Sequence, residues 1–271
     1  MPELPEVETI VHSLRPRLFG QRIRGLTLHR TDIVHPFGFD LAAALIGHRV
    51  TDLFRRGKRI VFQVDDDNHF FIHLGMSGRL TIQSAETSPR KHTHLLLTFG
   101  GKRSPIVVHF TDPRRFGGIW WLGTDPPQGT MGPEPLTLRA SQLATRLAKT
   151  KRPIKNALLD QRLIAGVGNI YADESLFLAG LHPLRLAHTL NADEINRLMH
   201  AIKLTLRRAI HHKGSTLRDY VDGDGKRGSF QLRHNVYDRA DEPCRKCHTS
   251  LSRMVIAGRS SHFCPTCQPR Q

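Results

Sequence analysis

Four cysteines near the C-terminus form two C-x2-C pairs separated by sixteen residues: Cys244, Cys247, Cys264 and Cys267. Zn²⁺ accepts four thiolates in a tetrahedral arrangement, and this spacing is typical of a structural zinc site. Disulfide bonds are the alternative, but they need an oxidising compartment, and the N-terminal stretch MPELPEVETI lacks the apolar core of an export signal. We therefore expect one zinc ion held by reduced thiolates in a cytoplasmic protein. The spacing alone does not separate a nucleic-acid-binding module from a structural clip.

The N-terminus carries a second group of residues that could do chemistry. Removal of Met1 before the small residue Pro2 would leave a free secondary amine. An α-amine has a pKa near ~8, so part of it is unprotonated and nucleophilic at neutral pH. Attack on a sugar C1′ would end in an iminium ion that acts as an electron sink, and Glu3 could donate a proton to the opening ring. Proline is also common at position two as a helix lead-in, so this motif alone does not decide the function.

The charge of the chain narrows the class of partner. The 271 residues include 40 Lys and Arg against 24 Asp and Glu, which gives a formal net charge of +16 and a pI near 10.5. Such an excess raises self-repulsion in the folded chain, and a polyanionic partner is the natural explanation. Together with the cysteine pairs, this charge favours a nucleic acid. The sequence contains no run of 18 apolar residues and no lipidation motif, so we expect no membrane association.

The elements that position these residues differ between the two halves of the chain. Residues 5–18 predict a helix, because Pro5 suits its first position and Val7, Ile10 and Leu14 share one face. The following hundred residues contain short apolar runs between turn formers, which is typical of an antiparallel β-sandwich or barrel. The predicted strands are 23–28, 59–64, 69–74, 79–82, 94–99, 105–110 and 118–122.

A stretch rich in proline and glycine at 123–137 indicates a connection between domains. Beyond it the pattern is helical, with Asn191 as the expected N-cap of the longest helix, followed by a Gly- and charge-rich loop at 216–233. The predicted helices are 139–149, 154–160, 169–179 and 191–212. We therefore predict an α+β multidomain protein with a helix and β-sandwich at 1–124, a linker at 125–138, a helical domain at 139–234 and a zinc hairpin at 235–271.

Seven motifs along the chain carry a family resemblance. They are PELPEVET, FRRGKR, HLGMSG, TDPRRFG, GPEPL, AGVGNIYADESLF and the terminal zinc hairpin, in that order. Together they closely resemble the bacterial formamidopyrimidine-DNA glycosylases, which excise oxidised purines from DNA. The resemblance spans essentially the whole chain. It implies a catalytic N-terminal β-sandwich, a DNA-binding helical domain with a helix–two-turns–helix element, and a zinc finger that is a β-hairpin.

The resemblance also implies the catalytic residues. Pro2 would be the Schiff-base nucleophile and Glu3 the general acid. Lys58 would contact the damaged nucleotide and assist β-elimination, although the basic cluster around it could also be a solvated charge run. Arg259, five residues before Cys264, would act at the lesion's phosphates and in δ-elimination.

Three further residues match the family's void fillers: Met76, Arg114 and Phe116. An enzyme that acts on a base in a duplex must rotate it out of the stack, at a cost of a few kcal/mol. Met76 and Phe116 would fill the vacated space, and Arg114 would bind the orphaned cytosine. Without the resemblance, Met76 and Phe116 would be interpreted as core residues. The glycines and serine around Met76 nevertheless favour a loop tip.

The resemblance places DNA contacts in both halves of the chain. Gly166 and Gly168 permit a tight connection, and Asn169 opens a helix whose N-terminus can bind a phosphate. No strand precedes this Gly-x-Gly, so a dinucleotide site is not predicted. The basic residues just upstream are predicted phosphate contacts: Lys151, Arg152 and Lys155. His92 matches a position that contacts DNA in the family.

One departure and two alternatives remain open at the level of sequence. Ser229 stands where many relatives have an aromatic residue in the loop expected to cover the flipped base, which leaves the lesion preference open. An oxidised-pyrimidine glycosylase is one alternative, but Leu4 and TDPRRFG favour the purine branch. A non-catalytic DNA-binding relative is the other, and the presence of Pro2, Glu3 and Lys58 argues against it. We expect a monomer that acts in the bacterial cytoplasm, at the nucleoid, on duplex DNA with oxidised bases or abasic sites.

Overall fold

The computed structural model describes residues 2–100 and 105–270, so Met1, whose removal the sequence predicts, lies outside the described residues. The chain forms two compact units. Unit 1 contains the residues up to Gly129 together with His212–Ser229, and unit 2 contains Thr130–His211 and the residues from Phe230 onward. The segment 212–229 therefore returns to the N-terminal unit. The four-part division predicted from the sequence stays a prediction.

Unit 1 is a helix packed on two sheets. One sheet has the strand order β1-β7-β8-β6 and the other β2-β9-β5-β4-β3. All pairings are antiparallel except the short parallel pair β2–β9. The elements are α1 (Leu4–Leu18), β1 (Ile23–Leu28), β2 (Val34–His35), α2 (Leu41–Leu45), β3 (Val50–Arg56), β4 (Arg59–Val64), β5 (His69–His73), β6 (Arg79–Gln83), β7 (Thr93–Phe99), β8 (Ile106–Thr111) and β9 (Gly118–Gly123).

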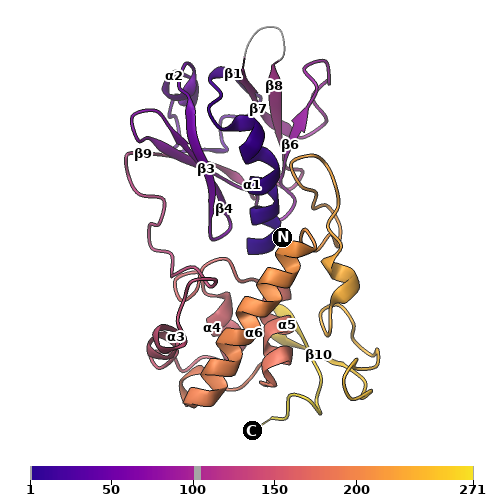
Figure 1. The fold of residues 1–271 in the computed structure, drawn as a ribbon. Coiled ribbons are helices and arrows are strands. Elements are labelled where there is room, and N and C mark those ends of the chain that lie inside the picture. Colours follow the sequence, from indigo (N-terminus) through magenta and orange to yellow (C-terminus); the bar gives the residue numbers. More distant parts are fainter. Residues whose placement is uncertain (1, 101–104, 271) are drawn as a thin grey trace. The chain divides into compact units, whose positions relative to one another are not determined.

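The core of unit 1 joins α1 to both sheets. The helix packs alongside β3 and β4, as Figure 1 shows, and its apolar face is buried as the sequence predicts. Val7, Ile10 and Leu14 are fully buried and share one cluster with Phe62 and Phe110 of the sheets. Because a fully buried apolar side chain of this size stabilises the fold by roughly 1.5–3 kcal/mol, this cluster anchors the N-terminus firmly.

Three elements of unit 1 are absent from the predictions: β2, α2 and β3. β3 is the informative case, because it forms one arm of a hairpin with β4. Its sequence VTDLFRR places Asp52, Arg55 and Arg56 among the apolar residues, which breaks the alternation expected of a strand. The antiparallel pairing with β4 stabilises β3 as a strand, although the local sequence pattern does not predict one.

Unit 2 combines helices with a β-hairpin, so the predicted α+β fold class is confirmed. All four predicted helices are present, and the longest begins with the predicted cap: Asn191 Oδ1 accepts from the Glu194 amide at 2.9 Å, and Glu194 returns a bond to the Asn191 amide. The elements are α3 (Ala140–Leu147), α4 (Ile154–Leu159), α5 (Asn169–Ala179), η1 (Ala187–Thr189), α6 (Ala192–His211), η2 (Phe230–Arg233), β10 (Ser252–Ile256) and β11 (Arg259–Phe263). Within residues 2–100 and 105–270, no helix has the length and apolarity that a membrane crossing requires.

Candidate functional site

The N-terminal residues are buried against the rest of unit 1. Pro2 and Glu3 precede α1, and both are buried. The Glu3 amide donates to Glu6 Oε2 at 2.8 Å, and Glu6 Oε1 accepts from the Ser215 amide at 2.7 Å. Gly214 allows this approach, because a Cβ at that position would lie 2.7 Å from Glu6 Oε1. The buried Glu6 carboxylate thus fixes the chain that leads to Pro2.

The segment 212–229 docks onto α1 through further hydrogen bonds. The Tyr220 hydroxyl donates toward the Glu6 carbonyl at 3.3 Å, and the Gly223 amide donates to Ser13 Oγ at 2.9 Å. Burial and the nearby Glu6 raise the pKa of Tyr220, so this hydroxyl stays a donor at neutral pH. Ser229 is exposed at the end of the segment, where its amide donates to the His212 carbonyl.

Lys58 lies in the turn of the β3–β4 hairpin. The pairing of Arg56 with Arg59 leaves Gly57 and Lys58 as a two-residue turn, and Gly57 has the positive φ of 58° that such a turn favours at its first position. Arg55 Nε bonds Glu8 Oε2 of α1 at 2.6 Å, with the Arg55 side chain only 7% exposed. The hairpin end is therefore tied to the same end of α1 that follows Pro2 and Glu3. Lys58 itself is buried.

His73 lies near Lys58 and Arg59 and is neutral at physiological pH. Burial first, then the positive charges of Lys58 and Arg59, lower the pKa of His73 to about 4. Its Nδ1 accepts from the Gly75 amide at 3.2 Å, which suits a neutral imidazole with the proton on Nε2. His73 therefore positions the loop that follows it without adding charge to the site.

The loop that carries the predicted void fillers depends on one buried carboxylate. Asp112 is fully buried, and its Oδ1 accepts from Ser77 Oγ at 2.6 Å. The amides of Arg114 and Gly117 donate to its two oxygens at 3.3 and 2.8 Å. The Asp112 amide also donates to the His92 carbonyl. His92, a predicted DNA contact, is exposed and is thus held next to the loop that Asp112 stabilises.

The three residues predicted to be void fillers lie on the loops held by Asp112. Met76 is 43% exposed and Phe116 is 55% exposed, as expected for residues at loop tips and not for core residues. The Arg114 guanidinium lies 4.7 Å from the centre of the Phe116 ring, in a cation–π contact. The structure thus brings Arg114 and Phe116 together on one exposed edge of unit 1.

The four cysteines converge as the sequence predicts. Their sulfur atoms all lie within 4.8 Å of one another, and Cys247 Sγ lies 3.4 and 3.5 Å from the sulfurs of Cys264 and Cys267. A tetrahedron of Zn–S bonds of about 2.3 Å places its sulfurs about 3.8 Å apart, so the set fits one zinc ion. The amides of Lys246 and Cys267 point at the sulfurs of Cys244 and Cys264, an arrangement that stabilises thiolates.

Arg259 and Asn169 lie close together in unit 2. β10 and β11 are joined by the two-residue turn Ala257-Gly258, so Arg259 is the first, exposed residue of β11. Asn169 begins α5, and its Nδ2 donates to the Ser260 carbonyl at 3.0 Å. The residue after Arg259 is therefore bonded directly to the N-terminus of a helix, where an anion is favoured.

The three predicted basic contacts upstream of α5 divide into two kinds. Lys151 and Arg152 are exposed, although Arg152 also pairs with Asp160 at 2.8 Å. Lys155 is only 1% exposed, and its Nζ is paired with the fully buried Asp173. Lys155 is therefore not placed for the phosphate contact predicted from the sequence. We correct that prediction, because the side chain is an internal cation of unit 2.

Four carboxylates that hold these loops and helices were not predicted from the sequence: Glu6, Asp112, Asp173 and Glu174. Each is buried although it is charged. One signal was available, since all four lie inside the motifs PELPEVET, TDPRRFG and AGVGNIYADESLF. Their partners are distant in sequence, however, so the pattern alone could not distinguish them from ordinary surface charges.

Comparison with known families defines the class of protein. The N-terminal domain model of formamidopyrimidine-DNA glycosylase matches residues 1–119, and the H2TH domain model of the same enzyme matches residues 131–221. A model described as the zinc finger found in FPG and IleRS matches residues 241–270. The sheets, helices and hairpin described above follow this order, so the chain has the architecture of a DNA glycosylase with a zinc finger.

Proteins that are similar over the whole length of this chain identify its family. The formamidopyrimidine-DNA glycosylase of Chloroflexus aurantiacus is 45% identical, over 99% of this chain and 98% of the relative, and that of Thermomicrobium roseum is 45% identical, over 99% of both. Among solved structures, MutM (Fpg) of Thermus thermophilus superposes with a TM-score of 0.88 at 38% identity over 100% of both chains. The Lactococcus lactis Fpg bound to DNA with an abasic site gives 0.90 at 33%, over 99% and 100%. The chain belongs to the formamidopyrimidine-DNA glycosylase family.

Replacement of one zinc ligand should remove the metal without unfolding the whole chain. We expect the parent to contain one zinc per chain and Cys247→Ser to contain little, because three thiolates bind the ion more weakly than four. The hydrophobic cluster of unit 1 contains none of the cysteines, so the far-ultraviolet circular dichroism should stay close to that of the parent. Native mass spectrometry measures the metal. Thr266→Ala, between two ligands, is the matched control and should keep zinc.

Lowering the pH from 7 to 5 should destabilise unit 1 through His73. The unfolded chain binds this proton near pH 6.5 and the folded chain only near 4, so stability is present above pH 6.5 and is lost as the pH falls toward 4. The loss between pH 7 and 5 should be about 1–2 kcal/mol. Urea unfolding at both pH values should show this loss in the parent and in His29→Gln, an exposed control, and less of it in His73→Gln. An unchanged pH dependence in His73→Gln would contradict the assignment.

Proposed function

We propose that the chain is a bifunctional base-excision repair enzyme, which removes oxidised purines such as formamidopyrimidines and 8-oxoguanine and then cleaves the strand as an AP lyase. The observation that carries this proposal is the buried group at the N-terminal end of α1. Pro2 and Glu3 lead into the helix, and the Arg55–Glu8 ion pair ties the hairpin of Lys58 to its first turns. The similarity of the whole chain to formamidopyrimidine-DNA glycosylases supports this proposal.

The chemistry proposed at this group uses the Pro2 nitrogen as nucleophile. Its lone pair forms a bond to C1′ of the damaged nucleotide, the bond from C1′ to the base breaks, and Glu3 protonates the opening sugar ring. The resulting iminium ion withdraws electrons, so loss of a C2′ proton expels the 3′ phosphate in β-elimination. Lys58 contacts the nucleotide during this step. Arg259 acts in the second elimination, which expels the 5′ phosphate.

The proposed partner is duplex DNA with an oxidised base or an abasic site. Solved complexes of the Lactococcus lactis protein contain DNA with an abasic site or with Fapy-dG. In this chain, Met76 and Phe116 are exposed on loops held by Asp112, where they could occupy the space of an extruded base. His92, Lys151, Arg152 and Asn169 are the proposed phosphate contacts. The net charge of +16 supports such a partner, and we propose action as a monomer on the DNA of the bacterial cytoplasm.

Trapping with borohydride tests the proposed nucleophile. Protein that begins at Pro2, mixed with an 8-oxoguanine duplex and borohydride, should form a covalent adduct that peptide mapping places on Pro2, because reduction fixes the iminium ion. A variant with one added residue before Pro2 should form none there, since its nitrogen is then an amide. Duplexes with formamidopyrimidine and oxidised pyrimidine lesions measure the substrate class in the same assay. An adduct on Lys58 alone would contradict the proposed mechanism.

Arg114 should discriminate the base opposite the lesion. Its guanidinium is stacked on the exposed Phe116, from where it can hydrogen-bond a cytosine left unpaired, and such a bidentate contact is worth roughly 1–3 kcal/mol of discrimination. Arg114→Ala should lower excision opposite cytosine and narrow the gap to other opposite bases in single-turnover assays. Arg115→Ala removes the same charge from the same loop and is the matched control. Equal losses opposite all four bases in Arg114→Ala would rule out base recognition.

A further inference from the structure

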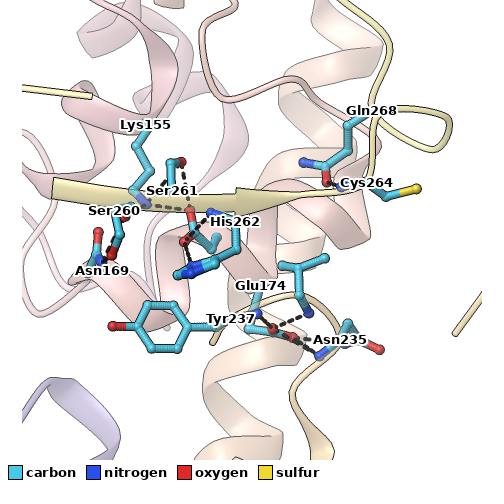
Figure 2. A network of polar contacts seen from close by, with 12 residues as sticks. Lys155, Asn169, Glu174, Asn235, Tyr237, Ser260, Ser261, His262, Cys264 and Gln268 are labelled. Atoms are coloured by element: carbon cyan, nitrogen blue, oxygen red, sulfur yellow. Dashed lines mark hydrogen bonds and ion pairs between the residues drawn. The ribbon is translucent and has the colours of Figure 1, made fainter. Parts of the chain in front are cut away.

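Two adjacent carboxylates of α5, Asp173 and Glu174, connect this helix to the zinc-finger segment. Each is only 1% exposed. Their polar partners come from the chain that enters the finger and from strand β11, many positions away in the sequence, and Figure 2 shows this network. A buried carboxylate lowers the stability of the fold unless hydrogen-bond donors surround it. The donors around Asp173 and Glu174 therefore indicate which segments these two residues hold in place.

Asp173 binds the outgoing strand β11. Its Oδ1 accepts from Ser261 Oγ at 3.1 Å, and its Oδ2 accepts from the His262 amide at 3.0 Å. Lys155 completes the arrangement, because its Nζ pairs with Asp173 and also donates to the Ser260 carbonyl and to Ser261 Oγ, both at 3.2 Å. The ion pair therefore bonds consecutive residues of β11, and these directly follow Arg259.

Glu174 binds the chain that enters the finger. Its Oε1 accepts from the amides of Asn235, Val236 and Tyr237, each at 2.9 Å, and its Oε2 accepts from Asn235 Nδ2 at 2.9 Å. Consecutive amides that converge on one carboxylate form a rigid contact. The finger is thus held to α5 at its entry by Glu174 and at β11 by Asp173.

The position of Arg259 depends on this arrangement. The Ser260 carbonyl accepts from both Asn169 Nδ2 and Lys155 Nζ, so the residue after Arg259 is held by two donors of the helical part of unit 2. An apolar pair in place of Lys155 and Asp173 would fill the same space but would have no directional bonds to β11. The buried charge therefore supplies orientation in addition to packing.

We propose that the Lys155–Asp173 ion pair is a positioning element, which fixes β11 on α5 so that Arg259 and the N-terminus of α5 act on the DNA backbone as one site. This proposal rests on the proposed function, because Arg259 is assigned there to the second elimination. Lys155 and Asp173 act through Arg259 and do not touch the substrate.

The test separates the orientation of β11 from catalysis. Hydrogen exchange of the DNA-free protein, with zinc content checked, should show at least tenfold faster exchange of the His262 amide in Lys155→Met than in the parent. Lys149→Met, the same substitution at an exposed lysine, should leave the exchange unchanged. This arm needs no enzymatic activity. If the parent itself shows no elimination, the proposed function fails while the exchange result still stands.

The second arm measures the products formed on a pre-made abasic site. Lys155→Met should lower the ratio of δ- to β-elimination product at least fivefold, as we also expect of Arg259→Ala, and the double variant should lose no more than Arg259→Ala alone. Asp173→Asn, which keeps an oxygen acceptor, should lie between the parent and Lys155→Met. If Lys155→Met folds poorly, Ser261→Ala removes one bond of the network and should lower the ratio in the same direction. An unchanged product ratio, or losses that multiply in the double variant, would overturn the proposal.

Discussion

A charged carboxylate inside a protein costs several kcal/mol unless donors surround it, and this constraint organises the functional parts of the chain. Glu6 takes the amides of Glu3 and Ser215, and Asp112 takes those of Arg114 and Gly117. Asp173 and Glu174 do the same for the zinc-finger segment. For Glu6, Asp112 and Glu174 these donors include backbone amides outside the strands, which would otherwise lack partners inside the fold. Asp173 differs, because its donors are the Lys155 ammonium, the Ser261 hydroxyl and the His262 amide of β11. The carboxylates therefore convert loops into fixed supports.

These supports explain how exposed side chains can have defined positions. Phe116 and Met76 leave apolar surface in water, which lowers the stability of the free protein. Their loops are nevertheless held from behind by Asp112 and Ser77, both buried, and by the neutral His73. In the wedge role proposed for Met76 and Phe116, such a loop would lose little conformational freedom on DNA binding, which would leave more contact energy for extruding a base.

Lys58 and Lys155 are both buried, but they lie in different surroundings. Lys58 lies in a hairpin turn whose position is set by the neighbouring Arg55–Glu8 ion pair. Lys155 lies inside unit 2 with its charge matched by Asp173. The sequence motif around each lysine is basic, and the sequence predicted a contact with DNA for both side chains. The carboxylate partner and the burial of Lys155 are features of the tertiary structure that the basic motif alone does not predict.

The sequence by itself determined the features that depend on local chemistry. The cysteine spacing predicted the zinc site, apolar periodicity predicted α1 and the four helices of unit 2, and Asn191 predicted the start of α6, because each pattern acts within a few residues. The tertiary structure alone decided the strand β3, the return of segment 212–229 to unit 1 and the burial of Lys155. These features depend on partners such as β4, Glu6 and Asp173 that are distant along the chain. No local pattern encodes such a pairing, because its free energy appears only when the fold brings the groups together.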